Sequence, residues 1–158
     1  MKTFHSPSKG PMDLQEVVTD ILEYISEDMS RPYKILVGSD SHPGSQGTCF
    51  VSAIIIHRLG KGGRYYYNKK IEKKIKSLRQ RIFYEASLSL ALADELCEWL
   101  KKYGRDDMKV EIHLDVGTHG DTKELVREVT GMIVGSGFDA QIKPYSCAAS
   151  KVADRHTK

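Results

Sequence analysis

The chain has 158 residues, enough for one domain with a sizeable core and too few for two ordinary ones, so we expect a single domain over residues 1–158. The hydrophobic fraction of 40% and the charged fraction of 28% exclude a disordered chain or a fibrous repeat. The net charge of +3 is too small to predict an anionic partner by itself.

Neither a membrane segment nor a secretion signal is expected. No apolar run approaches the roughly 18 residues that span a bilayer, and the start MKTFHSPSKG lacks the apolar core of a signal peptide. The three cysteines, Cys49, Cys97 and Cys147, are odd in number and far apart, which argues against a disulfide framework or a zinc ribbon. We expect a cytoplasmic protein whose cysteines are structural thiols.

The first half of the chain predicts a helix followed by three strands. Asp13 and Glu16 form a capping-box-like start, and apolar residues recur at helical spacing over about 14–27. Residues 33–39 contain three successive apolar residues, typical of a strand buried on both faces, and end in Gly38-Ser39-Asp40. Two more β-rich runs, 48–58 and 65–71, follow after short turns, so the three strands should form an antiparallel meander.

The second half alternates helices and strands. A long helix is predicted over 78–103, and residues 109–116 alternate apolar and polar side chains, as in a half-buried strand. A helix starting near Asp121 and Glu124 should end at the glycines 135 and 137. A short strand over 138–143 and a small-residue helix over 147–154 complete the chain.

This order is the topology of the ribonuclease H-like fold. It reads as a three-strand meander followed by αβαβα, with one extra helix at the N-terminus. We therefore expect an α/β domain built on a mixed, five-stranded sheet.

Four acidic residues stand at positions that invite a functional role. Asp40 ends the first predicted strand, Asp115 ends the fourth, and Asp154 lies in the last helix, although turn formation, helix capping and simple solvation would explain each of them singly. Glu85 lies on or beside the apolar stripe of the long helix, so it should have a cationic partner. The topology makes the first and fourth strands neighbours, so Asp40, Glu85 and Asp115 can converge. Carboxylates brought together repel unless a cation intervenes, and oxygen ligands favour Mg²⁺ or Mn²⁺ over zinc.

The chain resembles the YkuK-type proteins of the ribonuclease H-like superfamily. The resemblance rests on Gly38-Ser39-Asp40-Ser41, Ile75-Lys76-Ser77-Leu78-Arg79, Glu85-Ala86-Ser87-Leu88, Lys143-Pro144-Tyr145-Ser146, Ala148-Ala149-Ser150 and Val152-Ala153-Asp154. It implies the superfamily's metal site, with Asp40, Glu85 and Asp115 as the core acids and Asp154 as the variable fourth. Ser39 departs from the threonine of the family. The family has no settled activity, so the resemblance supplies no substrate.

Two alternative sites remain open. Ser39, Ser41 and His42 could form a nucleophilic-serine site, although no nucleophile elbow surrounds either serine. A second alternative is a hydrolase that holds zinc or another transition metal through a mixed nitrogen and oxygen site, whose ligands would be His42, His119, His156, Asp40 and Asp115.

The predicted function is a metal-dependent nuclease. Asp40 would bridge two ions, Glu85, Asp115 and Asp154 would complete their ligands, and His119 or His156 would assist proton transfer. A basic patch would hold the phosphates of RNA or DNA; its members are Lys69, Lys70, Lys73, Lys74, Lys76, Arg79 and Arg81. A non-catalytic nucleic-acid-binding module is the alternative from a different class, and the sequence leaves the oligomeric state open.

Overall fold

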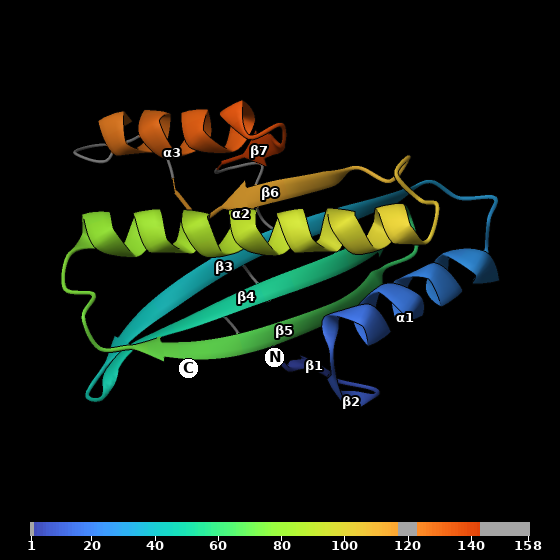
Figure 1. Ribbon diagram of the computed structural model, residues 1–158, viewed down its shortest axis with the longest axis horizontal. Coiled ribbons are helices and arrows are strands. Elements are labelled where there is room, and N and C mark those ends of the chain that lie inside the picture. Colours follow the sequence, from blue (N-terminus) through green and yellow to red (C-terminus); the bar gives the residue numbers. More distant parts are fainter. Residues whose placement is uncertain (1, 117–122, 143–158) are drawn as a thin grey trace.

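The computed structural model describes residues 2–116 and 123–142. Its centre is a mixed seven-stranded sheet in the order β2-β1-β5-β4-β3-β6-β7 (Figure 1). The strands are β1 (Phe4–Ser6), β2 (Gly10–Met12), β3 (Tyr33–Gly44), β4 (Gly47–Arg58), β5 (Gly63–Glu72), β6 (Val110–Leu114) and β7 (Asp139–Gln141). Three helices, α1 (Leu14–Glu27), α2 (Leu78–Lys102) and α3 (Lys123–Gly135), share one core with the sheet.

The predicted antiparallel meander is confirmed, and so is the predicted position of the fourth strand beside the first. β3, β4 and β5 pair antiparallel in sequence, and β6 lies parallel beside β3 with Ile35 opposite Val110 and Ser39 opposite Leu114. The first and fourth predicted strands are therefore adjacent. In the ranges 2–116 and 123–142, no helix is long and apolar enough to cross a membrane.

Two features differ from the prediction. The sheet gains the short N-terminal strands β1 and β2, whose three residues each are too few to show an alternating pattern. β3 does not end at Ser39 but continues to Gly44, because the polar residues after it keep pairing with β4 up to Gly44 opposite Gly47. The predicted last helix, and Cys147 in it, lie outside the described residues. Cys49 and Cys97 are free thiols.

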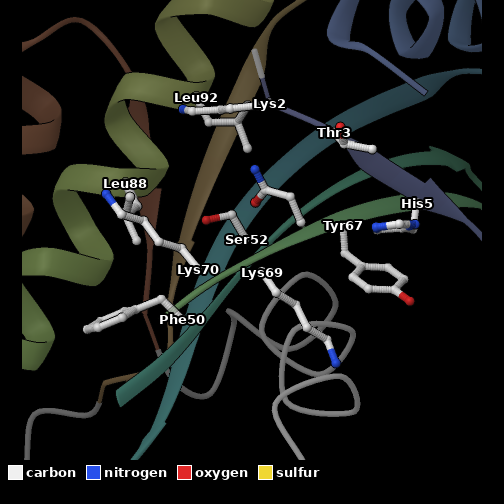
Figure 2. A pocket seen from close by; sticks show the side chains of 11 residues that line it. Lys2, Thr3, His5, Phe50, Ser52, Tyr67, Lys69, Lys70, Leu88 and Leu92 are labelled. Atoms are coloured by element: carbon white, nitrogen blue, oxygen red, sulfur yellow. The ribbon is translucent and has the colours of Figure 1, made fainter. Parts of the chain in front are cut away.

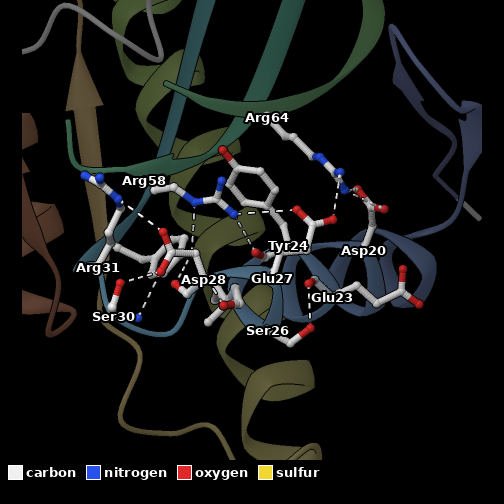
Figure 3. A network of polar contacts seen from close by, with 12 residues as sticks. Asp20, Glu23, Tyr24, Ser26, Glu27, Asp28, Ser30, Arg31, Arg58 and Arg64 are labelled. Carbon is white, nitrogen blue, oxygen red and sulfur yellow. Dashed lines mark hydrogen bonds and ion pairs between the residues drawn. The ribbon is translucent and has the colours of Figure 1, made fainter. Parts of the chain in front are cut away.

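A polar network fastens α1 to the sheet (Figure 3). Asp20 is 3% exposed and accepts hydrogen bonds from Lys9, from Arg64 at 3.2 Å and from the hydroxyl of Tyr66. Burial alone would raise the pKa of Asp20, but the hydrogen bonds from Lys9 and Tyr66 and the charge of Arg64 hold it below its usual range. Asp20 therefore has a structural role, because these hydrogen bonds join α1 to β5 and to the connection between β1 and β2.

Candidate metal centre

Strand β3 divides its side chains between the two faces of the sheet. The Ser39 hydroxyl hydrogen-bonds that of Ser52 at 2.8 Å and accepts a bond from Ser89 of α2 at 2.9 Å. Ser41 also faces α2, where its hydroxyl donates to Glu85. Since successive residues of a strand point to opposite faces, Asp40 lies on the face away from α2.

Asp115 comes directly after β6, which ends at Leu114. Val110, Ile112 and Leu114 of β6 and Val116 after it belong to the core on the helix side, so the same alternation places Asp115 on the opposite face, which it shares with Asp40. Asp115 follows Leu114, the partner of Ser39, by one residue, just as Asp40 follows Ser39. The two half-buried aspartates are therefore neighbours, one on β3 and one just past the end of the parallel strand β6.

Glu85 lies on α2, on the face of the sheet opposite to this pair. It is 7% exposed, and its carboxylate accepts a 2.5 Å hydrogen bond from the Ser41 hydroxyl. Arg81, one helical turn earlier, donates to the same hydroxyl at 3.1 Å and to the Ser41 carbonyl oxygen at 3.2 Å. The cationic partner expected for Glu85 is thus Arg81, which acts across Ser41.

The electrostatics connect the three acids. Burial first, and then the negative charges of Asp40 and Asp115, raise the pKa of Glu85 to about 8, against the hydrogen bond from Ser41 and the charge of Arg81. A carboxyl group in this environment keeps its proton at neutral pH. The surroundings of Glu85 therefore favour either a proton or another positive charge.

The described part of the chain holds no group of three or more His, Cys, Asp or Glu side chains placed to bind an ion as they lie. Glu85 stands on the helix side of the sheet, whereas Asp40 and Asp115 stand on the other. Asp154, His119 and His156 lie outside the described residues. His42 is exposed on the Asp40 face of β3.

His113 is a buried residue that the alternating sequence pattern predicts on the wet side of its strand. It shares the Asp115 face of β6, yet it is only 5% exposed. Neither ring nitrogen has a hydrogen-bond partner among the residues described, although Nε2 lies 3.5 Å from an oxygen of Glu111. Burial lowers the pKa of His113, with Glu111 opposing. Its position two residues before Asp115, on the same face of an alternating strand, is the sequence feature that would have placed His113 near the candidate acids.

The basic side chains of the predicted patch differ in how far they are free to bind a phosphate. Arg79 forms an ion pair with Glu128 of α3 at 2.9 Å, and Arg81 is turned inward to Ser41. Lys70 lies 3.9 Å from Glu72 and 5.4 Å from the centre of the Tyr84 ring. The exposed cations on the β5 end and the connection to α2 are Lys69, Lys70, Lys73, Lys74 and Lys76.

Comparison with known proteins decides the family. Residues 16–158 match the family model described as ribonuclease H-like. The chain belongs to this ribonuclease H-like family. It is also 32% identical, over 166 residues, to the uncharacterised protein YkuK of Bacillus subtilis (strain 168), an alignment that covers 98% of this chain and 96% of the relative. No solved structure gave a significant match. The YkuK-type resemblance and the ribonuclease H-like fold class are thereby confirmed.

Proposed function

We propose that the protein is a divalent-metal-dependent nuclease that hydrolyses phosphodiester bonds of nucleic acid. The observation that carries the proposal is the pair of aspartates at the ends of two adjacent parallel strands, Asp40 on β3 and Asp115 just after β6, within electrostatic range of the buried Glu85. Membership in the ribonuclease H-like family supports a function connected with nucleic acid.

The residues fit a hard divalent cation in chemistry and charge. All the proposed donors are carboxylate oxygens, which suit Mg²⁺ or Mn²⁺. A bound cation would also offset the repulsion that, after burial, raises the pKa of Glu85. Asp40 and Asp115 would hold the ion and Asp154 would complete its ligands, whereas the Glu85 carboxylate, which is bonded to Ser41 on the other face of the sheet, would have to turn toward them to join. When bound, such an ion lowers the pKa of water and stabilises the leaving oxygen.

The remaining residues would orient Glu85 and bind the substrate. Arg81 and Ser41 fix the orientation of Glu85 through two consecutive hydrogen bonds. The exposed lysines of the patch would hold phosphates through charge, and His119 or His156 would move a proton. In this assignment Glu85 is ionised only when the cation is bound.

A cleavage assay tests the proposal. The wild-type protein, incubated with single-stranded, duplex and hybrid substrates, should cleave at least one of them with Mn²⁺ or Mg²⁺ and none in EDTA. Gel analysis of end-labelled strands gives the readout. If the protein binds the panel but leaves every substrate intact with either ion, the non-catalytic binding module replaces the nuclease, an outcome that the absence of a ready three-ligand group among the described residues would then explain.

The basic patch gives a second prediction. Changing Lys69, Lys70, Lys73 and Lys74 together to Gln should weaken nucleic-acid binding and flatten its dependence on salt, by about 0.7 to 0.9 in the slope of log K against log salt for each phosphate that the variant no longer neutralises. These lysines are exposed, so the melting temperature should change little. Fluorescence anisotropy across a salt titration measures both the affinity and its slope. An unchanged slope would show that the phosphates bind elsewhere.

A further inference from the structure

A pocket of about 730 Å³ opens between α2 and the β5 side of the sheet (Figure 2). It forms on the helix-side face, where β1 pairs with β5 only through His5 and Tyr67. Its volume lies in the range of small-molecule sites, roughly 300 to 1,000 Å³. Neither the sequence patterns nor the proposed nuclease function uses it.

The pocket has a polar floor and an apolar wall. Ser52 and Asn68 are cross-strand partners on β4 and β5, and both line the pocket. The half-buried Leu88 of α2 supplies exposed apolar surface, backed by Leu92 of α2 and Phe50 of β4, which are each 1% exposed; Phe50 is held edge-on against Tyr84 at 4.6 Å between ring centres. A flat ring fits between such surfaces, and its polar edge can hydrogen-bond to the floor.

The floor is held rigidly. The Ser52 hydroxyl is bonded to Ser39, which is bonded in turn to Ser89 of α2, and all three serines are at least nine-tenths buried. This chain of hydroxyls ties β4, β3 and α2 together beneath the pocket. A hydroxyl fixed in this way is available as a directed hydrogen-bonding group without further ordering.

The lining residues carry positive charge only. Lys2, Lys69 and Lys70 line the pocket, and no acidic side chain among the described residues does. Lys2 is about half exposed and lies 3.9 Å from Glu95, a distance at which an exposed ion pair is weak, so Lys2 can turn to another anion. The pocket therefore offers cations at its mouth and apolar surface within.

We propose that this pocket binds a nucleoside monophosphate unit, either as a free nucleotide or as the terminal nucleotide of a strand. The base would lie against Leu88, which Leu92 and Phe50 support from behind, with Ser52 and Asn68 at its polar edge. The phosphate would lie between Lys2 and Lys70. A bare phosphate would leave the apolar wall unused, and an apolar ligand would leave the lysines unused. The proposal does not depend on the acids or on a metal ion.

Binding in EDTA tests it without any cleavage. The full chain is titrated with AMP, CMP, adenosine and ribose 5-phosphate, by calorimetry and by NMR shifts of the Asn68 and Leu88 amides. AMP or CMP should bind at least about tenfold more tightly than ribose 5-phosphate or adenosine, which each lack half of the ligand. A 5′-phosphorylated tetranucleotide distinguishes the two sources: tighter binding than AMP assigns the pocket to a strand end, and equal or weaker binding assigns it to a free nucleotide.

Two variants and a matched control locate the site. Lys2→Gln with Lys70→Gln should weaken AMP binding at least about tenfold, and Leu88→Glu should do the same by placing a carboxylate in the half-buried wall. Lys61→Gln with Lys101→Gln makes the same charge change on exposed lysines outside both the pocket and the basic patch and should leave AMP binding unchanged. Absence of AMP and CMP binding at millimolar concentration, equal affinity for ribose 5-phosphate, or equal loss in the control would each overturn the assignment.

Discussion

The Glu85→Gln variant should be more stable than the wild type at pH 7 in EDTA, and its advantage should grow as the pH rises from 5 to 8. Glu85 is 7% exposed, and its pKa in the folded protein is about 8, against an ordinary value of 4.5. Glutamine keeps the size of the side chain and can still accept the hydrogen bond from Ser41, but it carries no charge to bury.

The direction follows from proton linkage. The folded state holds the Glu85 proton to a higher pH than the unfolded state does. Above pH 4.5, loss of this proton therefore stabilises the unfolded state relative to the folded state. The wild type therefore loses stability steadily between about pH 4.5 and pH 8, whereas the variant has no such loss at this position. At pH 7 the difference is about 3 kcal/mol on the scale of 1.36 kcal/mol per pKa unit.

Urea unfolding of both proteins at pH 5, 7 and 8 measures the effect. Glu98→Gln, on the exposed face of the same helix, is the matched control and should change the free energy of unfolding by less than about 0.5 kcal/mol. A Glu85→Gln protein that is less stable than the wild type at pH 7 would show that Arg81 and Ser41 stabilise the ionised carboxylate more than burial penalises it.

The parts of the fold that depend on local patterns could be predicted from the sequence. The helix α1 begins at the capping box that Asp13 and Glu16 form, because both reciprocal hydrogen bonds are present. The strands of the meander carry long apolar or alternating runs bounded by glycine turns. By contrast, β1 and β2 are three residues each, and their stability comes from pairing with each other and with β5, which a local pattern does not record.

The candidate site was only partly predictable for a related reason. The sequence shows the acidic residues and predicts that they stand at strand ends. The face of the sheet on which each side chain lies depends on the register of its strand, and a shift of one residue moves the side chain to the opposite face. Ser41, not Asp40, faces Glu85, and Arg81 reaches the acid through that serine rather than directly. The sequence could not predict the nucleotide pocket, because its lining residues come from β4, β5, α2 and the N-terminal residues, which are far apart in the sequence and meet only in the folded protein.

The Asp40→Asn variant should lose both metal binding and metal-dependent cleavage. In the wild type, Mn²⁺ at about 100 times its dissociation constant should add about 2.7 kcal/mol to the free energy of unfolding, which raises the melting temperature by several degrees. Asp40→Asn removes one of the two carboxylates on neighbouring strands, so this rise should disappear. Cleavage of the best substrate should fall at least about 100-fold, because the water and the leaving oxygen lose the ion that stabilises them.

Binding of nucleic acid separates a lost ion site from a lost fold. Asp40→Asn removes a negative charge and leaves the lysine patch intact, so its affinity for the uncleaved substrate in EDTA should equal or exceed that of the wild type. Asp94→Asn, on the exposed face of α2, makes the same change outside the site and should retain the melting shift and the cleavage rate. A melting curve that zinc raises but Mn²⁺ and Mg²⁺ do not would assign the centre to the histidine-containing set of His42, His119 and His156. An Asp40→Asn protein that cleaves at the wild-type rate would remove Asp40 and its neighbour Asp115 from the chemistry, since the loss of one ligand on adjacent strands cannot leave a shared ion undisturbed.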